Sequence, residues 1–139
     1  MIPLAREAAC LVLLAMVPAS IAGVWHPRRP ADAPAIVQGE VTAATASTWR
    51  DALWIDVRPA DRYAAGHVPG ALRLDEDAWE DGLAELAAHW DGVRPIVVYC
   101  DGGGCEASRA VADRLRRELA AERVFAMQGG WTAWSSSPR

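Results

Sequence analysis

Lysine is absent from this sequence, and all 14 of its basic residues are arginines. The 18 acidic residues outnumber them, so the formal net charge is −4, and the arginines form no basic stripe. A protein that binds nucleic acid needs a positively charged surface, and this composition therefore argues against a nucleic-acid partner. Internal repeats are absent as well, and a chain of 139 residues has room for one domain and little more.

Cysteine is also scarce. Three cysteines cannot pair completely with one another, which excludes a disulfide framework. Cys10 lies in an apolar N-terminal block, so Cys100 and Cys105 are the pair left in the rest of the chain. The zinc-binding spacings CxxC…CxxC and HExxH are missing, and we therefore expect no metal site and no cofactor.

Aspartate, glutamate, lysine and arginine are missing from residues 8–27. An apolar stretch of about 20 residues can span a bilayer as a helix, and Trp25 would then lie at the membrane interface. A cleaved signal peptide is the competing interpretation, with small residues at Ser20-Ile21-Ala22 for the peptidase. A buried core helix is a third, because apolar residues surround the segment on every side.

These patterns divide the chain into three parts. We expect residues 1–26 to be a membrane anchor or signal segment, residues 27–39 to be a linker rich in Pro, Ala and Arg, and residues 40–139 to form the folded domain. As an anchor, the segment would hold the domain to the inner membrane of a bacterium, on the cytoplasmic side, because Arg28 and Arg29 flank its C-terminal end. Cleavage would instead release the domain into the periplasm.

From residue 40 onward, strand-like and helix-like segments alternate. Short apolar runs predict strands at 40–41, 53–57, 71–74, 96–99 and 124–126. Helical spacing predicts helices at 42–50, 61–65, 79–90, 106–120 and 131–134, the first capped by Thr42. On the fourth helix, the expected inward residues are Ala107, Ala110, Val111, Leu115 and Leu119. This alternation predicts an α/β fold, with a parallel five-stranded sheet flanked by helices.

The most informative segment is 97–108, which reads Val-Val-Tyr-Cys-Asp-Gly-Gly-Gly-Cys-Glu-Ala-Ser. A strand ends at Cys100, a glycine-rich loop follows, and then a helix begins. This arrangement places a nucleophile at the carboxyl edge of a parallel sheet, where loop N–H groups and the positive end of a helix point at it. We expect Cys100 to be acidified and catalytic. The predicted anion cradle consists of Asp101, Gly102, Gly103, Gly104, Cys105, Glu106 and Ser108.

Three motifs in order resemble the rhodanese-like (sulfurtransferase) domain family. They are Asp56-Val57-Arg58 with Gly66-His67-Val68-Pro69-Gly70-Ala71, then Val97-Val98-Tyr99-Cys100, then Gly129-Gly130-Trp131 with Trp134. The resemblance covers residues 40–134, and the N-terminal block is similar to that of membrane-anchored single-domain rhodaneses. It implies that Cys100 takes a sulfane sulfur from a small donor, becomes a persulfide, and passes the outer sulfur to a thiol or other acceptor.

The loop departs from the family's pattern. A rhodanese loop runs from the cysteine through four residues to an arginine and then a serine. Matching Ser108 to that serine makes this loop two residues longer, and the nearest arginine, Arg109, falls on the helix. Asp101 and Glu106 place negative charge beside Cys100, which opposes thiolate formation and repels a dianionic donor such as thiosulfate.

The remaining candidates have more than one interpretation. We expect Asp56 and Arg58 to form a structural ion pair that ties strand to loop, and His67 to hydrogen-bond within its turn. Cys105 is either a resolving partner of Cys100 or a residue that packs the start of the helix.

Two other functions stay open on the sequence: a thiol–disulfide or persulfide reductase that uses both cysteines, and a non-catalytic docking module. A phosphatase or arsenate reductase would need an arginine that closes the loop, and Arg109 lies too far along the chain.

Overall fold

The computed structural model describes residues 39–137, which belong to one unit of residues 34–139. The predicted anchor or signal segment, and all but the last residue of the predicted linker, lie outside the described residues. Between residues 39 and 137, none of the helices has the length and apolar character needed to cross a membrane.

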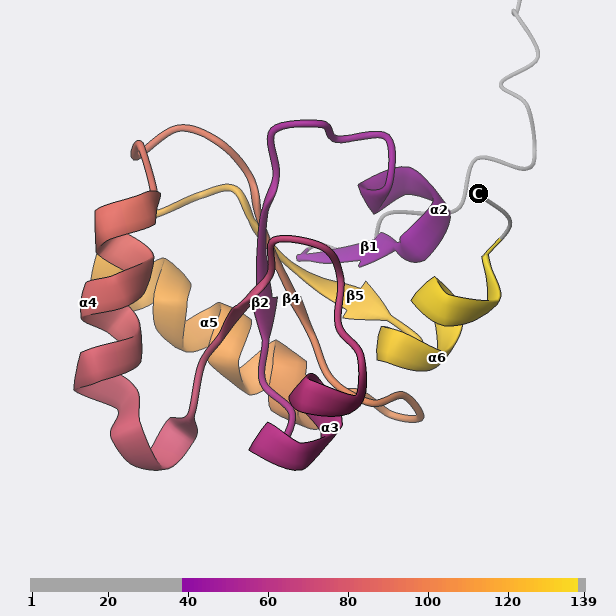
Figure 1. Ribbon diagram of the computed structural model, residues 1–139. Coiled ribbons are helices and arrows are strands. Elements are labelled where there is room, and N and C mark those ends of the chain that lie inside the picture. Colours follow the sequence, from indigo (N-terminus) through magenta and orange to yellow (C-terminus); the bar gives the residue numbers. More distant parts are fainter. Residues whose placement is uncertain (1–38, 138–139) are drawn as a thin grey trace, which may run out of the picture. The chain divides into compact units, whose positions relative to one another are not determined.

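Five parallel strands form a single sheet in the order β1-β5-β4-β2-β3 (Figure 1). The strands are β1 (Glu40–Thr42), β2 (Leu53–Asp56), β3 (Leu72–Arg73), β4 (Ile96–Tyr99) and β5 (Val124–Gln128). The predicted parallel five-stranded sheet is therefore confirmed. In the register, Asp56 of β2 lies beside Tyr99 of β4, so the segments that follow these two strands leave the sheet at the same edge.

Helices cover both faces of this sheet (Figure 1). They are α2 (Ala43–Ala46), α3 (Ala60–Ala65), α4 (Trp79–His89), α5 (Glu106–Leu119) and α6 (Gly130–Ser136), with a short 3₁₀ turn, η1 (Glu76–Ala78), before α4. Leu53 and Ile55 of β2 pack into the core under α4 and α5, whereas Trp54 between them packs into the core under α2 and α6. The central strands are apolar on both faces for this reason, which is the pattern that predicted them.

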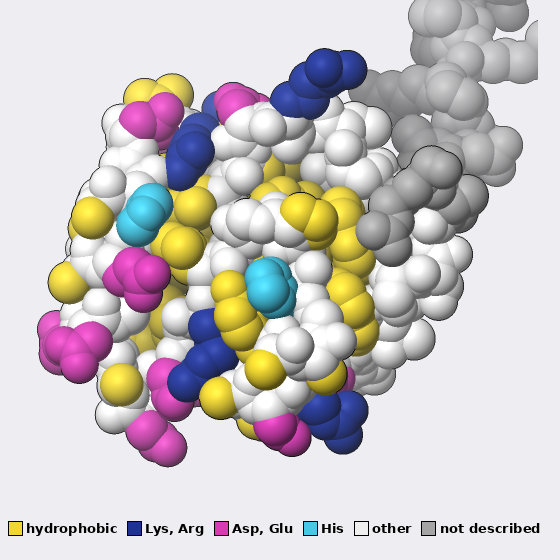
Figure 2. Space-filling view, in the orientation of Figure 1, with side chains coloured by type: hydrophobic (Ala, Val, Ile, Leu, Met, Phe, Trp, Pro, Cys, Tyr) yellow, Lys and Arg dark blue, Asp and Glu magenta, His cyan; other side chains and the backbone are white. Residues whose placement is uncertain are grey.

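Acidic side chains lie along η1 and α4 on the face drawn in Figure 2. They are the exposed residues Glu76, Asp77, Glu80, Asp81 and Glu85. Most of them precede α4 or lie in its first turn, where negative charge complements the helix dipole.

Two helices differ from their predictions. The first begins where expected, because the Thr42 side chain accepts a hydrogen bond from the Thr45 N–H at 3.2 Å, but it ends at Ala46. The next residues leave the helix, since the Ser47 hydroxyl donates to the Ala44 carbonyl at 2.7 Å and Thr48 bonds in the same way.

The inward face of α5 is rotated from the predicted one. Ala107 and Ala110 are exposed, so their predicted inward orientation is wrong. The buried residues are Ser108, Val111, Ala112 and Leu115. A polar residue can start this stripe because the Ser108 hydroxyl donates to the Cys105 carbonyl at 2.9 Å, which satisfies it inside the core.

Candidate functional site

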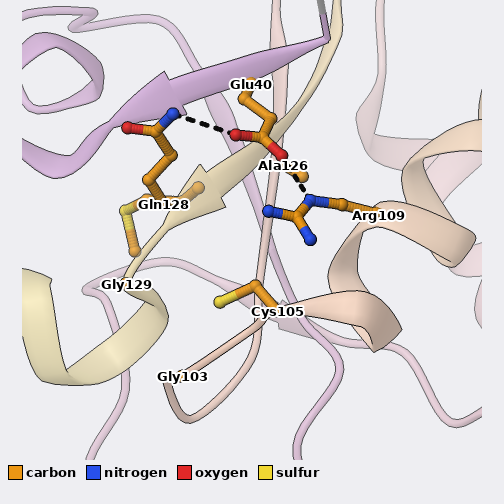
Figure 3. A pocket seen from close by; sticks show the side chains of 8 residues that line it. Glu40, Gly103, Cys105, Arg109, Ala126, Gln128 and Gly129 are labelled. Carbon is orange, nitrogen blue, oxygen red and sulfur yellow. Dashed lines mark hydrogen bonds and ion pairs between the residues drawn. The ribbon is translucent and has the colours of Figure 1, made fainter. Parts of the chain in front are cut away.

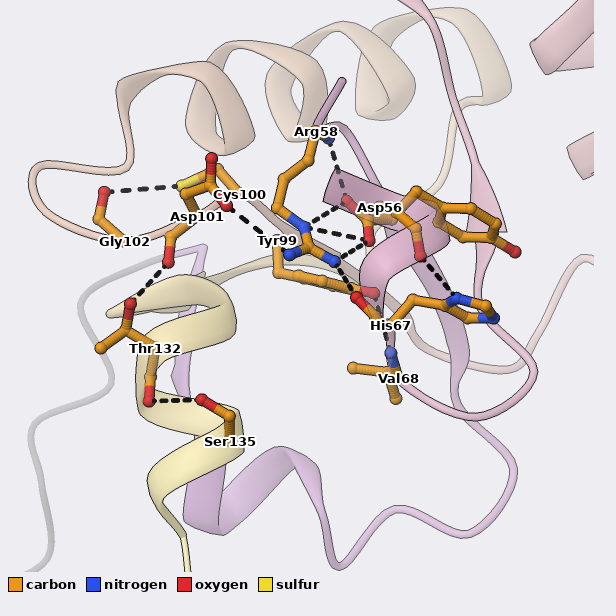
Figure 4. A network of polar contacts seen from close by, with 12 residues as sticks. Asp56, Arg58, His67, Val68, Tyr99, Cys100, Asp101, Gly102, Thr132 and Ser135 are labelled. Atoms are coloured by element: carbon orange, nitrogen blue, oxygen red, sulfur yellow. Dashed lines mark hydrogen bonds and ion pairs between the residues drawn. The ribbon is translucent and has the colours of Figure 1, made fainter. Parts of the chain in front are cut away.

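The structure places Cys100 directly after β4, at the carboxyl edge of the sheet, where its side chain is half-buried. Its Sγ lies 3.0 Å from the Sγ of Cys105. It also lies 4.0 Å from the Gly102 carbonyl oxygen (Figure 4). In both contacts the Cys100 thiol is the donor.

The loop ends where the predicted helix was expected to begin. Helix α5 begins at Glu106, so four residues separate Cys100 from Cys105, and Glu106 and Ser108 belong to the helix. Cys105 ends the loop in a left-handed conformation with φ +49°. Counted along the loop, Cys105 occupies the place where the family resemblance leads to an arginine.

Helix α6 holds this loop from the side. The Trp131 N–H donates to the Cys100 carbonyl at 2.7 Å, and the Thr132 N–H and hydroxyl donate to the Asp101 carbonyl at 3.0 and 2.9 Å. Gly130 makes the close approach possible, since a Cβ there would lie 2.3 Å from the Cys100 carbonyl oxygen, and its φ is +51°. The Gly129-Gly130 pair was the sequence signal for this contact, whereas no signal pointed to Thr132.

Cys105 is buried next to Cys100, and both cysteines are free thiols. Burial raises the pKa of Cys105 to about 11, and the hydrogen bond and charge of Cys100 act in the same direction. The Ser108 side chain and the Gly129 N–H offset only part of this change in pKa. Cys105 is therefore protonated at neutral pH.

A buried ion pair supports the site from β2. Arg58 donates to the Asp56 carboxylate through Nε at 3.0 Å and Nη2 at 2.7 Å, and Nη2 also donates to the Gly66 carbonyl (Figure 4). Both side chains are buried, at 3% and 0% exposure. Burial alone would lower the pKa of Arg58, but the bonds to Asp56 and its charge raise it overall, so the guanidinium stays charged.

The same arginine reaches the loop that follows Cys100. Its Nη1 lies 3.5 Å from the Asp101 carboxylate, and its guanidinium lies 4.7 Å from the centre of the Trp131 ring. The structure thus brings Asp56, Arg58 and Asp101 together beside Cys100. Part of the negative charge that the sequence placed next to the thiol is paired with a cation, which sequence reasoning missed.

Two aromatic residues, Tyr99 and His67, make hydrogen bonds that hold the segment between α3 and β3. The buried Tyr99 hydroxyl accepts the Val68 N–H at 3.0 Å, and burial raises the Tyr99 pKa well above its usual range. His67 Nδ1 lies 2.9 Å from the Tyr63 carbonyl oxygen, and its ring stacks on Tyr63 at 3.9 Å. The expected hydrogen bond of His67 therefore reaches back to helix α3 and joins the turn to that helix.

A recess lies beside the loop and is lined in part by Cys105 (Figure 3). It is a cavity of about 150 Å³ lined by Glu40, Gly103, Cys105, Arg109, Ala126, Met127, Gln128 and Gly129. Arg109 pairs with Glu40 and donates to the Gly104 carbonyl at 2.6 Å, so it braces the loop from outside. Hydrogen bonds from Gln128 and Arg109 lower the Glu40 pKa.

Metal ligands do not gather anywhere in residues 39–137, where His, Cys, Asp and Glu form no group of three that could hold an ion. The chemistry available to the described residues is that of two adjacent thiols, a charged guanidinium and a glycine-rich loop.

Residues 40–137 match the model of the rhodanese-like domain family. The chain is 31% identical over 87 residues to the thiosulfate sulfurtransferase GlpE of Pseudoalteromonas translucida, an overlap that spans 63% of this chain and 76% of that protein. It is also 39% identical over 80 residues to an HTH-type transcriptional regulator of Mycobacterium tuberculosis. That overlap covers 58% of this chain and only 33% of the regulator.

Solved structures share the fold. The thiosulfate sulfurtransferase of Pseudomonas aeruginosa superposes with a TM-score of 0.60 at 20% identity, over 71% of this chain and 18% of that one. The rhodanese-like domain of an Anabaena protein superposes with a TM-score of 0.57 at 24% identity, over 70% and 74% of the two chains. At these identities the likeness concerns the fold alone.

Proposed function

We propose that this chain, which belongs to the rhodanese-like domain family, is a sulfurtransferase that carries sulfane sulfur on Cys100. The observation that carries the proposal is the position of Cys100: a half-buried thiol at the carboxyl end of a central strand, followed by a glycine loop and the start of α5. The similarity to a thiosulfate sulfurtransferase supports the reaction class.

The reaction has two displacements on sulfur. The Cys100 thiolate attacks the sulfane sulfur of the donor, a bond forms between the two sulfurs, and the remainder of the donor leaves with the bonding electron pair. An acceptor thiolate then attacks the outer sulfur of the persulfide, and Cys100 leaves as a thiolate. No metal or cofactor takes part in either step.

The loop would act mainly on the anionic states. Gly102 and Gly103 adopt φ of +152° and +72°, which glycine tolerates because it has no side chain. Rotation of the loop N–H groups toward the sulfur would supply donors to a thiolate or a persulfide anion. The charged Arg58, 3.5 Å from Asp101, would keep the loop's own carboxylate away from the sulfur.

The donor that we propose is a persulfide or polysulfide rather than thiosulfate. Asp101 is half exposed even while paired, and Glu106 is exposed in the first turn of α5. Their charge repels a dianion more strongly than a monoanion.

A transfer assay on the full chain tests this proposal. Polysulfide and thiosulfate are offered as donors, with cyanide or a small thiol as the acceptor. We expect the wild type and Cys10→Ser to transfer sulfur at the same rate, and Cys100→Ser to transfer none. A Cys100→Ser variant that keeps the wild-type rate would refute the proposal, and an inactive wild type with an unreactive Cys100 would favour the docking module.

A further inference from the structure

We propose that Cys105 is a second catalytic residue, which attacks the inner sulfur of the Cys100 persulfide, closes a Cys100–Cys105 disulfide and releases the transferred sulfur as sulfide. This inference rests on the proposed function, because it starts from the persulfide. It adds a reductive outcome in which the chain delivers sulfide and not only sulfane sulfur.

The distance between the two sulfurs is the first support. The Cys105 Sγ lies 3.0 Å from the Cys100 Sγ, which becomes the inner sulfur of a persulfide. Attack distances for well-placed reacting atoms are about 3–3.5 Å, so the pair needs little movement to react. The outer sulfur would have to extend away from Cys105, toward the open side of the half-buried Cys100, which also leaves the outer sulfur in line as the leaving group.

The backbone around Cys105 is the second support. Cys105 has φ +49°, a conformation that costs energy in a residue other than glycine or asparagine and is retained where the surroundings impose it. Here it aims a buried side chain, 6% exposed, at Cys100. The intervening loop can give way as the sulfurs approach, because an added Cβ at Gly103 or Gly104 would meet no atom within 4 Å.

The step balances without an outside oxidant. The Cys105 thiol and the Cys100 persulfide anion give a Cys100–Cys105 disulfide and hydrosulfide. The new bond joins Cys105 Sγ to Cys100 Sγ, and the bond from Cys100 Sγ to the outer sulfur breaks. The outer sulfur leaves with the electron pair and takes the proton of Cys105, so it is reduced to sulfide while the two cysteines are oxidised to a disulfide.

Because Cys105 is protonated, it is a weak nucleophile before Cys100 carries a persulfide. In the resting site, burial together with the neighbouring Cys100 holds the Cys105 pKa near 11. A persulfide on Cys100 carries its charge on the outer sulfur, which lies farther from Cys105 than the Cys100 sulfur does. The departing sulfide is then the acceptor for the proton.

Two external thiols, or one dithiol, would complete the cycle. The first attacks the more accessible Cys100 sulfur and breaks the internal disulfide. Cys105 leaves as a thiolate, and the external thiol forms a mixed disulfide with Cys100. The second displaces Cys100 and is released as part of an external disulfide, so both cysteines return to thiols.

Thiosulfate radiolabelled in its outer sulfur, at a high concentration and with long exposure to offset its weaker reactivity as a donor, tests the inference on the full, reduced chain without any thiol acceptor. We compare the wild type with Cys105→Ser, Cys105→Ala and Cys100→Ser, and we measure labelled sulfide and intact mass. We expect the wild type to release about one equivalent of labelled sulfide per chain and to become lighter by two hydrogens. Both Cys105 variants should keep the label as a persulfide on Cys100 and release at least tenfold less sulfide. Near-ultraviolet circular dichroism checks that the variants are folded.

The outcomes separate the two proposals. If the wild type and both Cys105 variants all keep the labelled sulfur, Cys105 does not resolve the persulfide. The sulfurtransferase proposal would then still stand. A failure of the wild type and of every Cys105 variant to gain label from thiosulfate or, in a repeat, from polysulfide would overturn both.

Discussion

Asp101 places a carboxylate directly after Cys100 and near Arg58. Its carbonyl is held by Thr132, while its carboxylate lies 3.5 Å from Arg58 and remains 51% exposed. The sequence placed this carboxylate next to the thiol but gave no indication of its partner, because Arg58 lies 43 positions earlier and only the sheet register brings β2 and β4 side by side.

The first prediction concerns this charge. Asp101→Asn keeps the backbone contact with α6 and removes one negative charge, so we expect the KM for thiosulfate to fall roughly threefold to fivefold at low ionic strength. A polysulfide donor should respond less. The measurement is the initial rate of sulfur transfer against donor concentration, at low and at high salt.

Glu122→Gln provides the control, since it removes the same charge from an exposed position after α5, at the other end of that helix. Equal effects of the two substitutions would attribute the change to net charge. A thiosulfate KM that Asp101→Asn leaves unchanged would count against the electrostatic explanation of donor choice.

At the scale of elements, α6 fixes the loop that follows Cys100. The contact depends on Gly130, whose absent side chain leaves room for the Cys100 carbonyl. The family motif drew attention to the two glycines, but the residues they contact could not be predicted, because that contact joins the ends of β4 and β5 across the sheet.

We therefore predict that Gly130→Ala damages the site. The added methyl group would lie 2.3 Å from the Cys100 carbonyl oxygen, and the residue would keep an unfavourable positive φ. We expect the free energy of unfolding to fall by about 2 kcal/mol or more, and sulfur loading of Cys100 to fall at temperatures where the variant is still folded. Thermal unfolding followed by circular dichroism, together with a loading assay, measures both.

Gly104→Ala is the matched control for this substitution. It lies in the same loop, its φ is not positive, and its added methyl group would meet no atom within 4 Å. We expect wild-type stability and loading. If the two alanine variants behave alike, the hydrogen bonds between α6 and the loop do not position Cys100.

Other elements show where local patterns suffice. The apolar runs located the central strands β2 and β4, because strands buried on both faces are mostly apolar. The face of α5 was misjudged because alanine is compatible with either side of a helix, and the hydrogen bond that satisfies Ser108 depends on the position of Cys105. The left-handed conformation of Cys105, which brings its side chain to Cys100, could not be predicted, because the residue is not a glycine.

At the scale of the whole molecule, the question is where the domain is held. We predict that the apolar segment at 8–25, outside the described residues, anchors the full chain with the domain in the cytoplasm, because Arg28 and Arg29 follow it. In the cytoplasm the two cysteines would remain reduced. The measurement combines carbonate extraction of membranes with a C-terminal reporter that is active only in the periplasm.

We expect the protein to resist extraction and the reporter to stay inactive. A soluble mature form that starts near Gly23 would identify a signal peptide instead. An extraction-resistant protein with an active reporter would keep the anchor and reverse its orientation.

The central claim is that Cys100 carries sulfur, and intact mass spectrometry of the Cys105→Ser variant after brief exposure to polysulfide tests it most directly. This background blocks resolution by Cys105, so any persulfide formed should persist. The account predicts a gain of one sulfur atom, mapped to Cys100 by peptide analysis after thiol blocking, and no gain when Cys100→Ser is added. A variant that gains no sulfur, or gains it equally without Cys100, would contradict the account.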